Sequence, residues 1–473
     1  MKYRLEKDSL GTVSIPKDAY YGAQTQRALV NFPISGLLPD PVYVKATVLI
    51  KKAAVKTNYR LKLLERDIYQ AINFACDEIL RGKYIYQFVV DPFQAGAGTS
   101  HNMNVNEVIA NLANEKLGFA KGTYTKVHPN NHVNMAQSTN DVIPAAARIS
   151  LLLLWPDFSA ALVKTINTFQ KKAKDFSKIF KAGRTHLMDA LPVTLGGEFE
   201  AYALALKNDH DRLKKCRENL LILGLGGTAV GTGVNSHPQF TNIAVKELEQ
   251  LTGLKLKTSS NLQESMQNVS DFLDFSGCLR ILSQNLIRIG NDLRLMSSGP
   301  GTGLAELTIP EVQAGSSIMP GKVNPSIIEM LTMTAFQVIG SDQIILLASM
   351  HGQLELNVFM PVIIHNLTNQ IRYLTRSLTV FHDKYLRLVK ADETMCRFWL
   401  DRSAGLAAAL NPYLGYEKAA SLYRESLITG IPIKELVVKQ GLMTASEAAE
   451  NFNIKKLINP NLSAKRYVGQ RKS

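Results

Sequence analysis

The stretch from Gln263 to Ser298 reads QESMQNVSDFLDFSGCLRILSQNLIRIGNDLRLMSS and contains no proline. Large apolar side chains recur in it at every seventh residue, in two registers three positions apart: Phe272, Leu279, Leu286 and Leu293, and then Phe275, Leu282, Ile289 and Met296. This two-seam heptad pattern predicts a helix of about 35 residues, about 50 Å long. A helix of that length must bury its seams against other long helices.

Three further segments are candidate neighbours for this helix: 198–223, 326–350 and 360–388. Together they predict an all-α fold whose central domain, residues 141–393, is a bundle of long helices. Residues 1–140 form a mixed, mostly helical N-terminal domain in this interpretation. Residues 394–473 form a small helical C-terminal domain, with breaks at Asn411-Pro412, Gly430-Ile-Pro432 and Asn459-Pro460. An apolar strip along a long helix is also a place where subunits can meet.

The composition indicates a globular protein. The chain has 473 residues, of which 46% are hydrophobic, so it can bury substantial cores. The longest apolar runs, such as Ile149–Trp155, are far shorter than the roughly 20 residues that cross a bilayer, so no membrane span is expected. The first residues lack the apolar core and cleavage site of a secretory signal, which favours the cytoplasm.

Cysteine spacing and charge narrow the function classes further. The four cysteines show no CxxC spacing, which argues against a disulfide framework or a zinc site and predicts reduced, structural thiols: Cys76, Cys216, Cys278 and Cys396. The net charge of +14 would suit nucleic acid, an anionic membrane surface or a small anionic substrate. Because basic motifs interleaved with aromatic residues are missing, nucleic acid is disfavoured as a partner.

Four polar segments interrupt the helical sequence: 96–104, 137–141, 183–186 and 315–325. Dense Asn, Ser and Thr compete with the helical backbone for hydrogen bonds, so we expect loops, with helices following the first two at 105–117 and 145–155. The glycine-rich stretch 224–229 loosely fits a dinucleotide-binding motif, but it follows helical sequence and lacks a strand-helix-strand unit. No nucleotide cofactor is predicted from it.

The segment Gly315-Ser-Ser-Ile-Met-Pro-Gly-Lys-Val-Asn-Pro325 resembles the signature of the aspartase/fumarase superfamily. The resemblance extends along nearly the whole chain, through Asp18-Ala-Tyr-Tyr-Gly-Ala-Gln-Thr25, Asn102-Met-Asn-Val-Asn-Glu107, Gln137-Ser-Thr-Asn-Asp141, Gly183-Arg-Thr-His186, Leu191-Pro-Val-Thr-Leu195, Gly226-Gly-Thr-Ala-Val-Gly-Thr-Gly233 and Gly352-Gln-Leu-Glu-Leu-Asn-Val358. It implies three mostly helical domains, a central five-helix bundle, and a homotetramer with a twenty-helix core. In such a tetramer, loops from three subunits build each active site.

The chemistry implied by this resemblance is anti-elimination from a dicarboxylate. A proton leaves the carbon beside a carboxylate, the charge spreads into that carboxylate as an enediolate, and an amine or hydroxyl leaves the neighbouring carbon. Pre-oriented hydroxyls, amides and a cation stabilise such a charge as it develops, so no metal or other cofactor is required.

The resemblance also implies roles for individual residues. Ser316 is the general base, and because a serine hydroxyl is a poor base, Lys322 and loop amides would have to lower its pKa. Substrate carboxylates and the leaving amine are assigned to the remaining polar residues: Thr185, Lys322 and Asn324 at the α-carboxylate, Ser138, Thr139 and Ser317 at the carboxylate that becomes the enediolate, and Asn140 with His186 at the amine.

Within the superfamily the sequence favours the aspartases. Thr139 stands where fumarases usually have a second serine, and Tyr20-Tyr-Gly22 is also typical of aspartases, whereas Gln24-Thr-Gln-Arg27 leans toward fumarases. The predicted reaction is reversible elimination of ammonia from L-aspartate to give fumarate. Malate–fumarate hydration, a lyase for a different aspartate-like amino acid, and a catalytically silent structural paralogue are the alternatives.

Several positions depart from the superfamily pattern. His101 stands where relatives usually carry Thr or Ser in contact with a substrate carboxylate, and a histidine there either donates to the carboxylate as a cation or reshapes the pocket. Gly301 replaces a usual arginine, and Gly197 and Met188 replace common glutamines. His101 is therefore the residue expected to bear most directly on substrate choice.

Overall fold

The computed structural model describes residues 2–458, and in it the chain divides into two compact units. Unit 1 comprises residues up to 160, 209–284 and 334–376, and unit 2 comprises 161–208, 285–333 and the described residues from 377 onward. The structure is mainly helical, and its strands form four two-stranded sheets. The all-α prediction is confirmed. The three-domain limits at 140 and 393 stay a prediction, because the boundaries between the two units fall inside the long helices instead.

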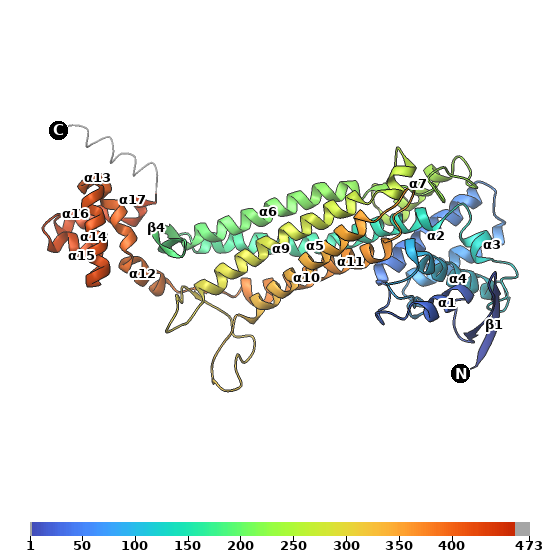
Figure 1. Ribbon diagram of the computed structural model, residues 1–473, viewed down its shortest axis with the longest axis horizontal. Helices are drawn as coiled ribbons and strands as arrows, with labels where there is room; N and C mark the ends of the chain where they lie inside the picture. Colours follow the sequence, from blue (N-terminus) through green and yellow to red (C-terminus); the bar gives the residue numbers. More distant parts are fainter. Residues whose placement is uncertain (1, 459–473) are drawn as a thin grey trace. The chain divides into compact units, whose positions relative to one another are not determined.

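Five long helices form the central elements (Figure 1). They are α5 (Thr139–Asp175), α6 (Leu195–Asn219), α9 (Ser270–Met296), α10 (Ser326–Met350) and α11 (Met360–Phe381). The heptad prediction is confirmed for α9, because all eight seam residues from Phe272 to Met296 are at most 4% exposed. The predicted helix over 263–298 is however two helices. A short helix α8 (Leu262–Gln267) ends where Asn268 takes an extended conformation, with φ −93° and ψ 139°.

Polar contacts fix the long helices against one another inside each unit. In unit 1, Ser276 Oγ on α9 donates to Asp342 Oδ1 on α10 over 2.7 Å, and Arg148 on α5 forms an ion pair of 2.7 Å with Asp271 on α9. In unit 2, Tyr202 on α6 donates to Asp292 on α9 over 3.0 Å. Each polar group has a defined partner, so the contacts set the register of the helices as well as their packing.

Two of these helices, α5 and α10, are also long and apolar enough to cross a membrane by length and composition alone. Half of the apolar window of α5 and a third of that of α10 are buried inside the protein. Core helices meet the same criterion. Most of the apolar window of α10 is therefore not buried inside the protein.

The N-terminal part of unit 1 is a helical layer with one hairpin (Figure 1). Strands β1 (Tyr3–Asp8) and β2 (Gly11–Pro16) pair antiparallel, and they precede α1 (Ala23–Asn31), α2 (Pro41–Arg60), α3 (Arg66–Leu80) and α4 (Thr99–Lys116). Helix α2 packs against α3 and against α7 (Phe240–Thr252). A continuous core of Val, Ile, Leu and Ala side chains lies between α2, α3 and α4. A short parallel pair, β5 (Ile222–Leu223) and β6 (Lys257–Thr258), completes the unit.

Helix α4 corrects the expected loop at 96–104, because the helix begins at Thr99. Its asparagines find partners outside the helix: Asn104 donates to Gln87 O over 3.0 Å and accepts from Val89 N, and Asn114 donates to Val127 O over 2.7 Å. Amide side chains satisfied in this way do not compete with the helical backbone. The helix expected at 145–155 is also longer than predicted. It is part of α5, which contains Pro144 and Pro156.

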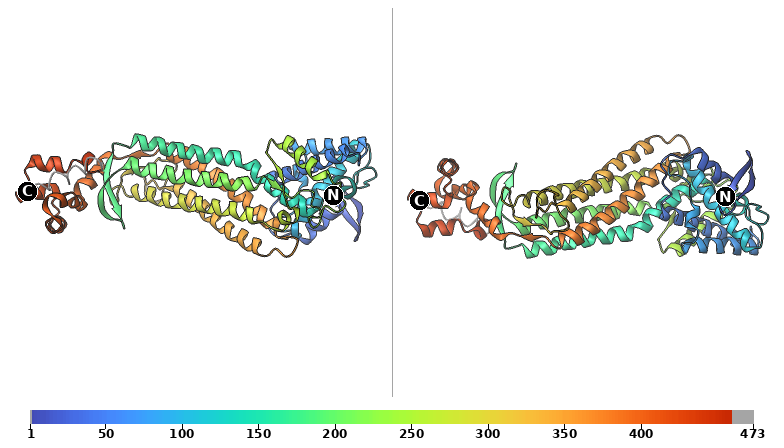
Figure 2. Two further views of the ribbon diagram at one scale, coloured as in Figure 1. Left: turned by 90° about the horizontal axis from the view of Figure 1, so that it is seen from above. Right: turned by 90° about the horizontal axis from the view of Figure 1, so that it is seen from below.

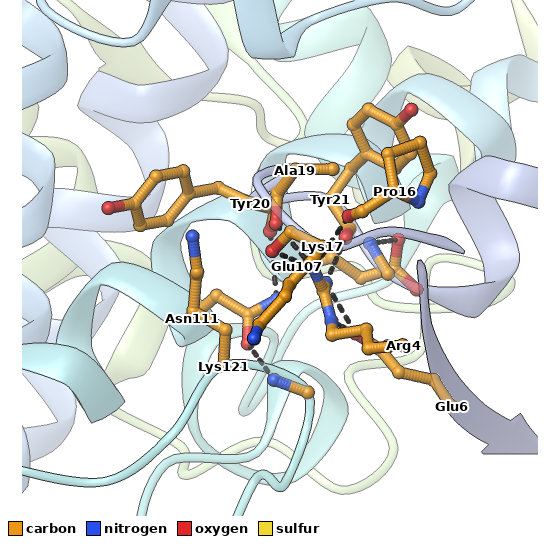
Figure 3. A network of polar contacts seen from close by, with 12 residues as sticks. Arg4, Glu6, Pro16, Lys17, Ala19, Tyr20, Tyr21, Glu107, Asn111 and Lys121 are labelled. Atoms are coloured by element: carbon orange, nitrogen blue, oxygen red, sulfur yellow. Dashed lines mark hydrogen bonds and ion pairs between the residues drawn. The ribbon is translucent and has the colours of Figure 1, made fainter. Parts of the chain in front are cut away.

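The segment 18–25 is held onto α4 by a buried polar network (Figure 3). The Glu107 carboxylate accepts from Gly22 N over 2.8 Å and from the Thr25 hydroxyl over 2.6 Å. Arg4 also holds this segment, because it donates to Ala19 O over 2.7 Å. Burial raises the pKa of Glu107 to about 6, against the opposing effect of these hydrogen bonds.

The C-terminal part of unit 2 is a small helical group (Figure 2). It contains α12 (Glu393–Arg402), α13 (Asn411–Leu414), α14 (Tyr416–Thr429), α15 (Ile433–Lys439), α16 (Ala445–Asn451) and α17 (Ile454–Leu457), which share one apolar core. The predicted breaks at Asn411-Pro412 and at 430–432 lie at the start of α13 and between α14 and α15. The break predicted at Asn459-Pro460 lies outside the described residues. Strands β7 (Leu307–Thr308) and β8 (Lys390–Ala391) pair antiparallel near the start of this group.

Candidate active site

Unit 1 contains a polar cavity of about 370 Å³. Three segments line it: the segment 134–139 that leads into α5, the first turn of α4, and the loop 228–235. The lining residues are Asn102, Met103, Asn134, Ala136, Gln137, Ser138, Thr139, Thr228, Ala229, Val234 and Asn235. Hydroxyl and amide groups thus face a space that a small polar molecule can fill.

The first wall is the N-terminus of α5. Ser138 caps the helix, because its Oγ accepts from Asn140 N over 3.3 Å. Ala136, just before the cap, has φ 60°, which turns the chain sharply into the helix. The first-turn amides and the partial positive charge of a helix N-terminus are suited to a carboxylate.

The second wall is the glycine-rich loop, and Asp141 joins it to the first. Asp141 Oδ1 accepts from Ser138 N over 2.9 Å, while Oδ2 accepts from Gly226 N over 2.9 Å and from Thr228 N over 3.1 Å. Asn140 adds a bond of 2.8 Å to Ala229 O. One buried carboxylate thereby fixes two loops that are distant in sequence.

Glycine is required at the start of this second wall. Gly226 has φ +94°, and a Cβ placed on it would lie 2.0 Å from Thr241 Oγ1. Neither the backbone conformation nor the space admits another residue without a shift. The motif glycine therefore holds the loop against α7.

Behind the cavity lies a fully buried lysine. Lys51 Nζ donates to Asn134 Oδ1 over 2.8 Å, and the same oxygen accepts from the Asn106 and Asn102 amides at 3.2 and 3.3 Å. Burial lowers the pKa of Lys51 to about 7, while the charge of Asp141 opposes this shift. Burial also raises the pKa of Asp141 to about 6. The negative charge of Asp141 favours the protonated form of Lys51, although the hydrogen bonds of the two side chains go to other groups.

Some polar atoms of the cavity wall have no partner. Asn102 Oδ1, Gln137 Oε1 and Thr228 Oγ1 are buried without a hydrogen bond among the described residues. Buried polar atoms normally find partners, because leaving one unpaired costs about 1–3 kcal/mol. All three residues belong to the cavity lining, so a polar ligand in the cavity could satisfy them.

His101 does not belong to the cavity lining. Its ring is fully buried, stacks on Tyr43 with 3.9 Å between ring centroids, and lies 3.0 Å from Thr47 Oγ1 through Nε2. Burial, helped by the charge of Lys51, lowers the pKa of His101 to about 3. The neutral form is therefore strongly favoured at neutral pH, which speaks against a cationic histidine at this position.

Unit 2 presents Thr185 and His186 at the tip of a hairpin. Strands β3 (Phe180–Thr185) and β4 (Met188–Thr194) pair antiparallel, and His186 and Leu187 form the two-residue turn with φ 55° and 60°. Thr185 and His186 are exposed. The strand is anchored by Arg184, which donates to the fully buried Glu306 over 2.9 Å.

Unit 2 also carries the loop 315–325, which has a closed neck and an exposed tip. At the neck, Gly315 N donates to Lys322 O over 2.9 Å and Asn324 Nδ2 donates to Gly315 O over 2.7 Å. Ser316 Oγ accepts from Ile318 N and Met319 N over 3.2 and 3.1 Å, so backbone amides already face this oxygen. At the tip, Ser317 and Lys322 are exposed and Ile318 is 83% exposed.

The structure therefore brings the predicted residues together in two groups. Ser138 and Thr139 line the cavity of unit 1 and Asn140 follows them in the first turn of α5, whereas Thr185, His186 and the 315–325 loop belong to unit 2. Within the described residues no hydrogen bond or ion pair joins His186 to the loop. Sequence reasoning missed Lys51, Asn134, Asp141 and Thr228. Asp141 and Thr228 lie inside quoted motifs, but nothing in the sequence signals that Lys51 is buried.

Comparison with known proteins identifies the family. A family model described as "Lyase" matches residues 11–340, and one described as "Fumarase C C-terminus" matches residues 406–459. The chain belongs to the aspartase/fumarase superfamily of lyases. The superfamily expected from the sequence motifs is thereby confirmed.

Relatives and solved structures match nearly the whole length of this lyase. The aspartate ammonia-lyase of Bacillus subtilis (strain 168) is 45% identical over 98% of both chains. A structure named as fumarate lyase:delta crystallin from Brucella melitensis bound to cobalt is 44% identical, with a TM-score of 0.94 over 97% of this chain and all of that one. A class II fumarase from Schistosoma mansoni is 34% identical, with a TM-score of 0.93 over the same shares.

Proposed function

We propose that this lyase is an aspartate ammonia-lyase, which eliminates ammonia reversibly from L-aspartate to give fumarate. The observation that carries the proposal is the cavity of unit 1, whose hydroxyl and amide donors at a helix N-terminus are suited to a small anion. The relatives named aspartate ammonia-lyase, at 44 and 45% identity over 98% of the chain, select aspartate as that anion.

In the proposed reaction Ser316 removes a proton from the carbon beside the side-chain carboxylate of aspartate. The electron pair of the broken C–H bond moves into that carboxylate as an enediolate, and it then forms the double bond of fumarate as the C–N bond breaks. The nitrogen leaves with the pair of that bond as ammonia. The two backbone amides that donate to Ser316 Oγ support this role, since they would stabilise an alkoxide.

The enediolate needs donors that are already in place when its charge develops. Ser138 and Thr139, at the N-terminus of α5, are proposed to meet this carboxylate, together with Ser317 from the loop. Thr185, Lys322 and Asn324 are proposed to hold the α-carboxylate, and Asn140 with His186 the leaving amine. Direct contact of His101 with the substrate stays a prediction. Its buried, neutral ring on Tyr43 favours an influence through packing.

We further propose that the complete site forms only in a homotetramer, where three subunits contribute to each site. Helix α10 supports an association surface, because several of its large apolar side chains are exposed: Met333, Phe336, Ile344, Leu347 and Met350. A contiguous exposed apolar face of this kind is typical of a subunit interface. A cytoplasmic location also stays a prediction.

The reaction can be tested by incubating the purified protein with L-aspartate and, separately, with L-malate. Fumarate and ammonia from aspartate are the expected products, followed by fumarate absorbance and an ammonia assay. Fumarate from malate alone would favour the fumarase alternative. If neither substrate reacts, other aspartate-like amino acids should be tested as substrates. The His101→Thr protein should be assayed beside the parent, because His101 is the departure expected to bear most directly on substrate choice.

Shared sites can be tested separately by mixing two inactive variants. Ser138→Ala lies in unit 1 and Ser316→Ala in unit 2. If different subunits supply the two residues, dissociating and reassembling an equal mixture restores about a quarter of the sites. If one subunit supplies both, no site in the mixture is intact and activity stays at the level of the single variants.

A further inference from the structure

Two cysteines that are distant in sequence lie side by side in unit 1. Cys216 on α6 and Cys278 on α9 are 62 residues apart in the chain, yet their Sγ atoms are 2.9 Å apart. Both thiols are free and buried, at 8% and 5% exposure. Both side chains project from long helices that pack along each other, so their positions are fixed by rigid elements.

A carboxylate completes a cluster with these thiols. Asp274 precedes Cys278 by four residues on α9, which places the two side chains on the same face of the helix. One ligand atom from each of Asp274, Cys216 and Cys278 lies within 4.8 Å of the others. Asp274 is exposed, so the cluster opens to solvent on one side. None of the three residues lines the cavity or belongs to the superfamily motifs.

We propose that Cys216, Cys278 and Asp274 form a binding site for a thiophilic divalent cation, Zn²⁺, with a water molecule from the open side as fourth ligand. Two thiolates and one carboxylate are a donor set that Zn²⁺ accepts, and thiolates select it over the harder Mg²⁺ and Ca²⁺. The ion would link α6 to α9 within unit 1. It has no part in the elimination reaction.

The geometry requires only a small adjustment. With Zn–S bonds of about 2.3 Å, two thiolates on one tetrahedral ion lie about 3.8 Å apart. Opening the present 2.9 Å separation to that distance needs only small rotations of the two side chains. Binding is also coupled to protonation. Burial raises the pKa of both thiols, so each releases a proton when the ion binds.

The experiment is a titration of the full-length reduced protein with Zn²⁺, followed by calorimetry in two buffers of different ionisation enthalpy. One ion per chain and release of about two protons are expected. Replacing Zn²⁺ with Co²⁺ should give the near-ultraviolet absorption of thiolate-to-cobalt charge transfer. Bound Zn²⁺ should also raise the melting temperature, because it binds only the folded protein.

Variants separate this site from adventitious binding. Cys278→Ser and Cys216→Ser should each weaken Zn²⁺ binding by more than about 100-fold and abolish the cobalt band, and Asp274→Asn should weaken binding by about tenfold. Cys76→Ser is the matched control, because Cys76 is another buried free thiol of unit 1 outside the cluster. It should bind Zn²⁺ as the parent does.

Two results would overturn the proposal. One is a protein with both thiols kept reduced that binds no Zn²⁺ at micromolar concentration. The other is binding that persists unchanged in Cys278→Ser. Lyase activity is not the readout, so this test stands apart from that of the proposed function.

Discussion

The cavity walls of unit 1 and the 315–325 loop of unit 2 carry similar side chains but are held very differently. In the walls, the buried Asp141 binds three backbone amides from two segments, and Asn134 accepts from Lys51, Asn102 and Asn106. In the loop, the bonds are those of the neck, those accepted by Ser316 and one from Lys322 N to Met319 O, and the tip is exposed. Similar polar composition thus produces a fixed polar wall in one region and an exposed loop in the other.

The difference matches two tasks in the proposed reaction. Donors that stabilise a developing charge act best when they are already oriented, since no reorganisation is then needed during the reaction. A general base on an exposed loop must instead reach the substrate after binding, and ordering that loop costs conformational entropy. Five experiments test this contrast.

The largest effect is expected from Ser316→Ala. Removing the proposed base should lower kcat by about 1,000-fold, within the usual range for general base catalysis. KM should change little, because the cavity walls stay intact. Steady-state kinetics with L-aspartate measures both. Ser177→Ala, which removes an exposed hydroxyl bonded to Lys174 O, is the control. Near-parental turnover in Ser316→Ala would refute the assignment.

A pair of glycine variants compares the two regions directly. Gly226→Ala should destabilise the protein by about 3 kcal/mol, since its Cβ would lie 2.0 Å from Thr241 Oγ1 and its φ is +94°. Gly321→Ala meets only the strain of φ +79°, with no atom within 4 Å, and should cost about 1 kcal/mol. Urea denaturation gives both values. Equal costs would contradict the view that the wall is tightly fixed and the loop is not.

Asp141→Asn tests whether one carboxylate holds both walls. The amide keeps the size of the side chain but replaces one acceptor with a donor that faces backbone N–H groups. We expect a loss of about 2 kcal/mol in stability and a rise in KM for aspartate. Asp271→Asn on α9 is the control, because it weakens the ion pair with Arg148 in unit 1 without touching the walls. A variant that loses stability and keeps its KM would restrict Asp141 to a structural role.

Glu107→Gln tests the pH dependence of the network behind the walls. Burial raises the pKa of Glu107 from its ordinary value of 4.5 to about 6, so the folded protein binds a proton more tightly than the unfolded chain. Its contribution to stability is full below pH 4.5 and is lost as the pH rises through 6, by about 2 kcal/mol. The variant lacks this loss. Relative to the parent, it should gain stability between pH 4.5 and 6 in denaturation measurements.

The smallest effect is expected from His101→Thr. The variant loses the stacking on Tyr43 and should be less stable by about 1 kcal/mol. If the ring shapes the back of the cavity, KM for aspartate should change by less than about tenfold. Kinetics with aspartate and with substituted aspartates provide the comparison. Unchanged KM and unchanged substrate preference would exclude His101 from substrate selection.

Much of the fold followed from periodicity. The eight seam residues of α9 are buried as the heptads predicted, because a long apolar stripe has no stable state except against other helices. The limits of α10 at 326 and 350 were predicted as found. The starts of α4 and α5 were not, since the amides that discourage a helix locally are satisfied by groups that only the folded chain brings near: Asn104 by Gln87 and Val89, and Asn140 by Ala229.

The superfamily, the long-helix bundle and the positions of the polar segments could be predicted from the amino-acid sequence, because each of these is recorded in local pattern and motif. The tertiary structure determines which of those segments meet. It buried Lys51 beside Asn134, joined two walls through Asp141, turned His101 away from the cavity, and set Cys216 against Cys278. These contacts connect residues far apart in the chain, and the free energy that selects them comes from burial and pairing in the folded state.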